Sequence, residues 1–164
     1  MFDLKKNIKK IFLLSLILIL TACKPGSELE AEFTPKAKNG DVEAQYRLGR
    51  LYIEGQGVAP SEKRGMLWIK RAAEGGLAIA QNDMGVMYAE GAIVRKDWVQ
   101  AAKWLILSGE KNDYGPAQTY WKDNIRDNIS AEDLKKAREL VDKWQVNVYK
   151  EEVEEKTDKK AEKK

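Results

Sequence analysis

A repeat with a period of 36 residues places the strongest constraint on what this chain can fold into. When residues 44–74 are aligned with residues 80–110, nine positions are identical, whereas about two would agree by chance at common residue frequencies. The identical pairs are Ala44/Ala80, Gln45/Gln81, Gly49/Gly85, Tyr52/Tyr88, Glu54/Glu90, Gly55/Gly91, Val58/Val94, Trp68/Trp104 and Glu74/Glu110. Periods of 20–50 residues are typical of solenoids, in which each unit buries its apolar face against its neighbours. The sequence therefore predicts a stack of repeated units.

Each unit is predicted to contain two helices. The first begins near Asp41 and ends at Glu54, where Gly55 supplies a left-handed C-terminal cap. The second begins after Ser61 in the first unit and after Asp97 in the next, and both side chains are good N-caps. Trp68 and Trp104 recur within these second helices and are predicted to be core residues. The fold class is therefore expected to be all-α.

A glycine interrupts each of the two first helices. Gly49 and Gly85 occupy equivalent positions, although glycine in a helix costs about 0.5–1 kcal/mol relative to alanine. We predict that the missing side chain lets a neighbouring helix approach closely. Tyr52 and Tyr88, one turn further on, would fill the space beside it. The cost of glycine is then offset by packing that recurs because the unit recurs.

The stretches AQYRLGRLYIEGQGV with WIKRAAEGG, and AQNDMGVMYAEG with AAKWL, resemble the Sel1-like repeat, a relative of the tetratricopeptide repeat. The resemblance covers about residues 39–126 and implies a short right-handed solenoid of helix-turn-helix units. There are departures, because Ile93 stands at the position of Gly57 and Leu77 at that of Asp41. A third unit begins at Gly115, shifted by one residue, and we interpret it as a degenerate capping repeat.

A last helix is predicted to start at Ser130 and to close the end of the solenoid. Leu134, Ala137, Val141 and Trp144 share one face of it. The repeat domain is then expected over residues 39–147. Residues 148–164 form a tail in which basic and acidic side chains balance, and we expect it to be solvated.

The first 22 residues are predicted to be a cleaved leader. The basic segment MFDLKKNIKK precedes IFLLSLILIL, a ten-residue and almost wholly apolar run that is too short to span a bilayer as a helix. Residues 23–38 are expected to be a tether, because Pro25, Gly26 and Pro35 oppose regular structure.

The sequence LTAC, residues 20–23, resembles the lipobox of bacterial lipoproteins. The resemblance implies cleavage before Cys23, a diacylglyceryl group on its sulfur and a fatty acyl group, such as palmitate, on its amine. Several acyl chains give stable membrane anchoring. In related lipoproteins an aspartate after the cysteine commonly means retention in the inner membrane. Lys24 stands there instead, so the resemblance favours the outer membrane, with the protein facing the periplasm.

Composition excludes several classes of function. The chain contains one cysteine and no histidine, which removes internal disulfides, Ser-His-Asp or Cys-His sites and thiolate metal clusters. Some cysteine-rich relatives in the Sel1-like family bind penicillin-like compounds, but they depend on disulfides that this chain cannot make. Without the charges of the first 22 residues, 25 basic and 25 acidic residues remain, so we expect no nucleic-acid binding. No metal or cofactor is expected beyond the covalent lipid.

Glu54 and Glu90 are the best candidates for a catalytic pair of carboxylates. Acid–base catalysis would need a cleft between them and one raised pKa, so we interpret both as parts of the repeat motif. Trp98 replaces Glu62 of the first unit, so the repeat does not require an aromatic residue there. We therefore predict that Trp98 is an exposed anchor for a partner. Because the chain has no histidine and its only cysteine is predicted to carry lipid, we predict that the protein is not an enzyme.

A protein-binding surface is predicted along the first helices, by resemblance to tetratricopeptide grooves. Its expected members are Glu43, Tyr46, Arg50, Ile53, Glu54, Ile79, Asn82, Val86, Glu90, Thr119 and Asp123, together with Trp98. Two roles fit such a surface. One is a periplasmic adaptor. The other is an immunity protein, because small lipoproteins with Sel1-like repeats resemble known neutralisers of phospholipase effectors delivered by type VI secretion. The sequence identifies neither the partner nor the oligomeric state.

Overall fold

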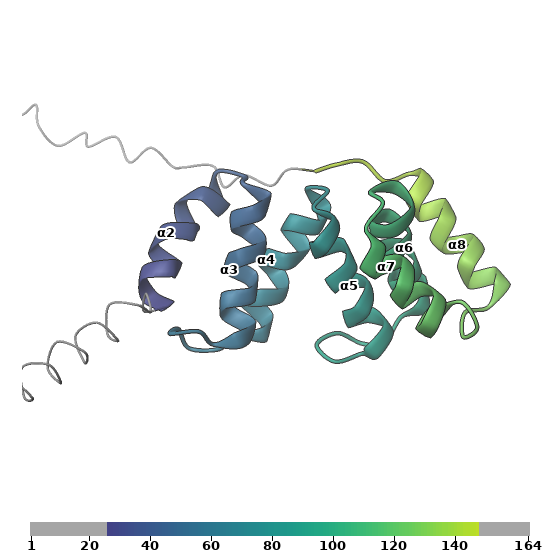
Figure 1. The fold of residues 1–164 in the computed structure, drawn as a ribbon, viewed down its shortest axis with the longest axis horizontal. Helices are drawn as coiled ribbons and strands as arrows, with labels where there is room; N and C mark the ends of the chain where they lie inside the picture. The colour runs from purple at the N-terminus through teal and green to yellow at the C-terminus, as the bar shows by residue number, and fades with distance from the viewer. Residues whose placement is uncertain (1–25, 148–164) are drawn as a thin grey trace, which may run out of the picture.

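A computed structural model of the chain describes residues 26–147, and every regular element in that range is helical (Figure 1). The helices are α2 (Gly26–Lys38), α3 (Val42–Glu54), α4 (Glu62–Glu74), α5 (Ala78–Glu90), α6 (Trp98–Ile106), α7 (Gly115–Tyr120) and α8 (Ala131–Asp142). Two π-helical turns, η1 (Leu107–Lys111) and η2 (Trp121–Ile125), continue α6 and α7. The predicted all-α solenoid of helix pairs is confirmed. The predicted leader, Cys23 and the charged tail lie outside the described residues.

The first helices begin and end where the repeat predicts. Asp41 caps α3, and its carboxylate accepts a hydrogen bond from the backbone N–H of Ala44 at 3.0 Å. Leu77 stands at the same place before α5 and has no side-chain oxygen to offer. Gly55 and Gly91 end the two helices in the left-handed conformation, with φ of 65° and 71°.

The loop after each first helix is held in the same way in both units. Ser61 and Asp97 cap α4 and α6, and each side chain accepts a backbone N–H three residues further on. Their own backbone N–H groups donate to the carbonyls of Tyr52 and Tyr88, at 2.8 and 3.0 Å. The second helix therefore starts from a fixed point on the first helix of its own unit.

Both helical glycines lie where two helices touch. A methyl group placed on Gly49 would lie 2.6 Å from Cγ1 of Ile69 and 2.8 Å from the carbonyl oxygen of Gly65, both on α4. A methyl group on Gly85 would lie 2.6 Å from Cγ of Leu105 on α6. The predicted close approach is confirmed in both units. Gly65 on α4 faces Gly49 but was not predicted as its partner, because the repeat counterpart of Gly65 is an alanine, Ala101.

The two repeated tryptophans are core residues, as predicted. Trp68 is 8% exposed and packs with Leu48 and Tyr52, whereas Trp104 is 3% exposed and packs with Met84 and Ile106 in the larger core cluster. Each second helix thus buries its aromatic side chain beneath the first helices.

The third unit is shifted by one residue because α6 and η1 together are one residue longer than α4. The second helix α4 has 13 residues, whereas α6 has nine and η1 adds five. The additional residue is accommodated as a π-helical turn, which is how helices commonly absorb a single insertion. Asp113 then takes the left-handed position that Gly76 holds one unit earlier, with φ of 51° and 93° respectively.

Residues 26–38 form a helix, and the expectation that the tether lacks regular structure is wrong. Pro35 lies inside α2. Leu29 and Phe33 pack against the same cluster as Trp68, which secures α2 on α3. A helix that gains enough tertiary packing tolerates a proline that would break an isolated one.

Three glutamine side chains show that α2 is a repeat helix. Gln45 donates to the carbonyl of Ala37 at 2.9 Å, and Gln81, 36 residues later, donates to that of Ala73 at 3.1 Å. In the third unit Gln118 donates to the carbonyl of Gly109 at 2.9 Å. Each bond ties a first helix to the end of the preceding second helix. Because Ala37 lies on α2, that helix is the second helix of a unit that precedes the two predicted ones.

The last helix closes the solenoid as predicted. Ala137 and Val141 of α8 are buried in the core cluster that contains Trp104. The chain after α8 then turns back across the ends of the preceding helices (Figure 1). The backbone N–H of Asn147 donates to the carbonyl of Glu74, at the end of α4, at 2.8 Å.

Candidate functional site

The predicted surface residues lie on three successive first helices. We use the name first-helix face for the members that remain at the surface: Glu43, Arg50 and Glu54 on α3, Ile79, Asn82, Val86 and Glu90 on α5, and Thr119 and Asp123 on α7 and η2. Side-chain hydrogen bonds join these helices. Tyr46 on α3 donates to Asp83 on α5, and Tyr120 on α7 donates to Glu90 at 3.4 Å. The three first helices therefore form one continuous layer.

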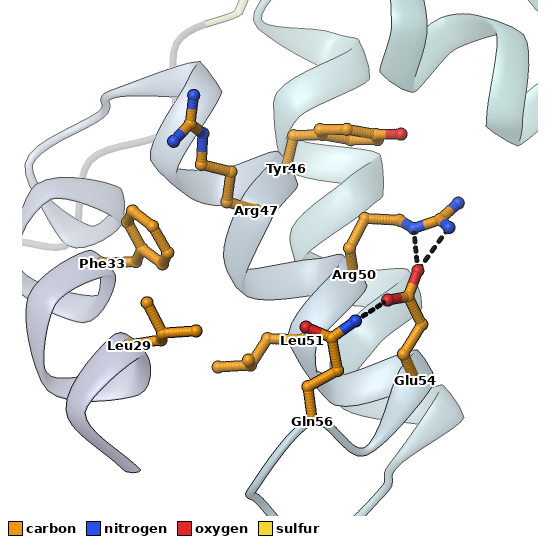
Figure 2. A pocket seen from close by; sticks show the side chains of 8 residues that line it. All are labelled: Leu29, Phe33, Tyr46, Arg47, Arg50, Leu51, Glu54 and Gln56. Carbon is orange, nitrogen blue, oxygen red and sulfur yellow. Dashed lines mark hydrogen bonds and ion pairs between the residues drawn. The ribbon is translucent and has the colours of Figure 1, made fainter. Parts of the chain in front are cut away.

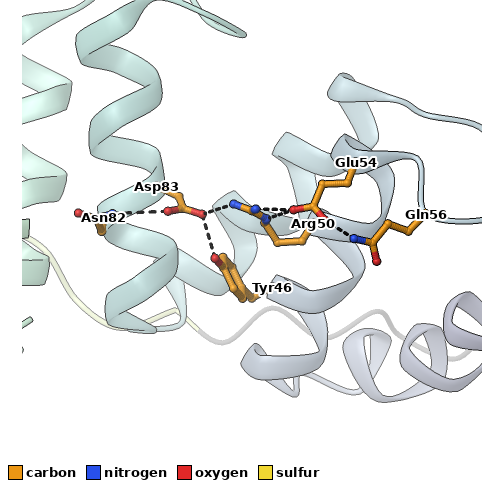
Figure 3. Close-up of polar contacts among 6 residues, drawn as sticks. All are labelled: Tyr46, Arg50, Glu54, Gln56, Asn82 and Asp83. Atoms are coloured by element: carbon orange, nitrogen blue, oxygen red, sulfur yellow. Dashed lines mark hydrogen bonds and ion pairs between the residues drawn. The ribbon is translucent and has the colours of Figure 1, made fainter. Parts of the chain in front are cut away.

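Asp83 is the centre of a polar network between α3 and α5 (Figure 3). One of its carboxylate oxygens accepts from the hydroxyl of Tyr46 at 3.0 Å and from Nη1 of Arg50 at 3.4 Å. Nε of Arg50 also donates to Glu54 at 2.7 Å, and the amide of Gln56 donates to the same carboxylate group. Asp83 was not among the predicted surface residues, although its repeat counterpart, Arg47, is also charged.

The tyrosines of this layer are held protonated. Burial, followed by the nearby Asp83 carboxylate, raises the pKa of Tyr46. Burial and Glu90 raise the pKa of Tyr120 in the same direction. A phenol with a raised pKa stays a hydrogen-bond donor at neutral pH. The network is therefore suited to holding helices in register, whereas a general base would need a phenolate or a carboxylate free to accept a proton.

Three predicted surface residues are placed differently from the expectation. Ile53 is half-buried against the core cluster, and its side chain fills the space where a side chain on Gly65 would lie. Tyr46 packs against the same cluster. Trp98 is half-buried against the cluster that contains Ala101, with the ammonium of Lys96 lying 4.1 Å from the centre of its ring. These aromatic and apolar side chains pack against residues of neighbouring helices, so Trp98 is partly covered, and its predicted role as a partner anchor stays a prediction.

The apolar members of the first-helix face come from α5. Ile79 and Val86 are partly exposed and stand at the repeat positions of Glu43 and Arg50. Between them, Asn82 has a buried carbonyl oxygen that no group in residues 26–147 contacts by a hydrogen bond. Apolar contact and an unused acceptor therefore lie next to the charged network of α3.

A separate groove lies between α2 and α3 (Figure 2). It encloses about 330 Å³. Its lining residues are Leu29, Phe33, Tyr46, Arg47, Arg50, Leu51, Glu54 and Gln56. The floor of the groove is apolar and its rim is charged. Arg50 and Glu54 line the groove and also belong to the first-helix face, so the two surfaces adjoin.

The described part of the chain gives no support to a metal site or a membrane span. Within residues 26–147, no group of three or more Asp, Glu, Cys or His side chains is placed to hold a metal ion. None of the helices in that range is both long and apolar enough to cross a bilayer.

Alkaline pH is expected to weaken the junction of α2 with the first unit. Tyr52 is 2% exposed, donates to Glu30 of α2 and lies under the guanidinium of Arg64. Burial and then the bond to Glu30 raise the pKa of Tyr52 to about 12, against about 10 when unfolded. The folded state therefore favours the protonated phenol, so this stability is present below pH ~10 and is lost as pH rises through ~12.

Urea unfolding at pH 9 to 12 measures this loss of stability, and Tyr52→Phe should flatten the dependence of the unfolding free energy on pH. An identical profile for both proteins would contradict the assignment.

Stacked helix pairs joined by repeated caps and glutamine bonds define an α-solenoid repeat protein. The sequence model of the Sel1 repeat matches residues 42–77 and 78–113, so the chain carries two consecutive Sel1 repeats. The matched ranges begin with α3 and with α5. The degenerate third unit lies beyond them.

The solved structure of one similar protein supports the same fold. The crystal structure of c5321, a protective antigen present in uropathogenic Escherichia coli strains and displaying an SLR fold, aligns with a TM-score of 0.66 and 27% identity over 78% of this chain. This chain spans only 28% of that protein's length. A Sel1 repeat protein from Oxalobacter formigenes aligns with a TM-score of 0.48 and 25% identity, over 70% of this chain and 97% of that one. No curated protein matches the sequence. Sel1 repeats generally mediate protein–protein interaction.

Proposed function

We propose that this protein is a lipid-anchored, periplasm-facing module that binds a protein partner on its first-helix face and catalyses no reaction. The observation that carries the proposal is the layer of three first helices, fixed by the Asp83 network and by the bond between Tyr120 and Glu90. A surface that is already ordered loses little conformational entropy on binding, which favours affinity.

The chemistry of this face supports a protein partner. Arg50 and Glu54 present a charged pair, whereas Ile79 and Val86 present apolar surface on the neighbouring helix. Protein interfaces commonly combine an apolar centre with a polar rim. The non-catalytic part of the proposal is supported by the absence of histidine from the chain and by the structural use of its buried tyrosines.

Capture of a partner tests the first-helix face. The purified chain, immobilised and incubated with envelope extract, should retain one protein in near-stoichiometric amount. Arg50→Glu and Val86→Asp should each reduce that protein about tenfold or more, the loss expected of central interface residues. Leu67→Asp on α4, where Leu67 is 47% exposed, is the matched control and should have no effect. Equal recovery with all variants would exclude this face, and hydrolysis of peptidoglycan or phospholipid by the purified chain would exclude the non-catalytic role.

Lipidation of Cys23 is a separate prediction. The sequence LTAC begins with the last residue of the apolar run, and the resulting anchor would hold the repeat domain at the membrane surface. Cells labelled with a palmitate analogue should give a labelled band for the wild-type chain and none for Cys23→Ser. The variant should also accumulate as uncleaved precursor or as released protein. Equal labelling of the two proteins would contradict the prediction.

The immunity role is the alternative within the same class. A short anchored binder with one rigid face is what neutralisation of a periplasmic toxin would need. The gene neighbourhood discriminates between the two roles, because a phospholipase or secretion-spike gene directly upstream favours immunity. Its absence favours the adaptor.

A further inference from the structure

The groove between α2 and α3 has a counterpart one unit later, between α4 and α5. That counterpart site is occupied by a helix. Four of its lining residues are Leu29, Phe33, Arg47 and Leu51. Their counterparts 36 residues later are Gly65, Ile69, Asp83 and Met87. The first pair in each set lies on a second helix, and the last pair lies on the first helix that follows it.

Inside the solenoid, α3 occupies the counterpart site. Gly49 of α3 packs onto Ile69, and Tyr46 and Arg50 of α3 bind Asp83. A helix occupies the next counterpart as well, because Gly85 of α5 packs onto Leu105. The site between a second helix and the following first helix is thus a seat for a helix, and it is used twice.

The N-terminal seat has no such helix among residues 26–147. The helix α2 is the second helix of its unit, and no first helix stands before it in the described chain. Leu29 and Phe33 line the groove from α2, and Arg47, with its side chain 56% exposed, lines it from α3 (Figure 2). The guanidinium of Arg47 lies 5.7 Å from the ring centre of Phe33 and pairs with Glu43 at 3.3 Å.

We propose that this groove binds an amphipathic α-helix of a protein partner, one that carries two small residues four positions apart and a carboxylate beside the first of them. This inference goes beyond the partner surface proposed above and does not depend on Val86 or Asn82. The small residues are required by size. Phe33 and Leu29 stand where Ile69 and Gly65 meet α3, so the incoming helix has less room.

The carboxylate is required by charge. Inside the solenoid the carboxylate of Asp83 accepts hydrogen bonds from Tyr46 and Arg50 of the helix that packs on it. Arg47 occupies the repeat position of Asp83, so the sign at that point of the seat is reversed. The ion pair of Arg47 with Glu43 is solvent-exposed and therefore weak, so a carboxylate on the partner can share or replace it.

The sequence of α5 supplies a matched probe. It already has Gly85 and Ala89 at the two small positions, and Val86 stands beside the first of them. A fluorescent peptide of residues 77–91 with Val86→Glu satisfies the proposed pattern, and the same peptide with Val86→Lys presents the wrong charge. A lactam bridge between a lysine and a glutamate introduced at two solvent-facing positions holds both peptides helical, because a free 15-residue helix is marginal in water.

Fluorescence anisotropy with the purified full chain tests the seat. The Val86→Glu peptide should bind about fivefold more tightly than the Val86→Lys peptide. The glutamate forms an exposed ion pair with Arg47, whereas the lysine is repelled by it. Arg47→Glu in the protein should reverse the order. Arg95→Glu, a charge reversal in the loop between α5 and α6, should leave it unchanged, and Phe33→Asp should weaken both peptides about tenfold or more.

Several results would overturn the proposal. Equal binding of the two peptides, or an order unaffected by Arg47→Glu, would show that the groove does not select a carboxylate-bearing helix. Binding that appears only after removal of residues 148–164 would assign the seat to the chain's own tail. A doubling of mass that Arg47→Glu abolishes would assign it to a second copy. Normal capture of the envelope partner alongside any of these results would leave the first-helix face intact, so the two proposals fail separately.

Discussion

Trp68→Ala is expected to lower the free energy of unfolding by about 3–5 kcal/mol, the usual cost of truncating a buried aromatic side chain. Trp68 is 8% exposed and packs with Leu48 and Tyr52 in the cluster that also holds α2. The guanidinium of Arg71 lies 4.5 Å from the centre of its ring. The substitution therefore removes apolar burial and a cation–π contact, and leaves a cavity under two first-helix side chains. Urea unfolding followed by far-ultraviolet circular dichroism measures the change.

Leu67→Ala is the matched control for this prediction. Leu67 is the neighbouring residue on α4 and is 47% exposed, so its truncation should change the unfolding free energy by less than about 1 kcal/mol. Losses of equal size for the two variants would show that the repeated tryptophan has no special place in the core.

Gly49→Leu is expected to destabilise the fold by about 1–3 kcal/mol through overpacking. Leucine favours a helix over glycine by up to about 1 kcal/mol, so propensity alone predicts the opposite sign. The first atom of the new side chain would already lie 2.8 Å from the carbonyl oxygen of Gly65. A backbone atom in a packed helix cannot move aside as a flexible side chain can, so the steric cost exceeds the gain in propensity.

Two further substitutions bracket this result. Gly49→Ala adds only the methyl group and should destabilise by less than Gly49→Leu. Glu43→Leu places leucine on the exposed side of the same helix, where no such contact exists, and should change stability by about 0.5 kcal/mol or less. A melting temperature that rises with Gly49→Leu would contradict the close-packing account of this glycine.

The local features of the fold were predictable because short-range chemistry determines them. Asp41, Ser61 and Asp97 cap the helices that they precede, and Gly55 ends α3 in the left-handed conformation. The period of 36 residues also located the core tryptophans, since a residue repeated at one place in successive units meets the same surroundings.

The N-terminal helix was not predictable from local signals. Gly26 and Pro35 oppose an isolated helix, and α2 forms because Leu29 and Phe33 pack onto α3. The repeat does extend into it, since Ala37 stands 36 residues before Ala73 and both accept a glutamine bond. Identity at so few positions is too weak a signal to find without the hydrogen bonds.

The candidate surface was predictable in outline and not in detail. Its placement on the first helices follows from the repeat, but the direction of each side chain depends on how neighbouring helices cross. Ile53 and Trp98 turn toward neighbouring helices, and Asp83 emerges as the residue that joins α3 to α5. The groove beside α2 required the structure, because it lies where, within residues 26–147, a second helix stands without a first helix before it.

Photo-crosslinking in living cells tests the central claim, that the first-helix face binds a protein partner. A photoreactive phenylalanine analogue replaces Val86 on α5 in one strain and Leu67 on α4 in another, since both side chains are apolar and accessible. We predict one discrete crosslinked protein from the Val86 position, absent from the Leu67 position and lost when Arg50→Glu is combined with the probe. The same adduct from both positions, or none from Val86 with the chain correctly located and folded, would contradict the account.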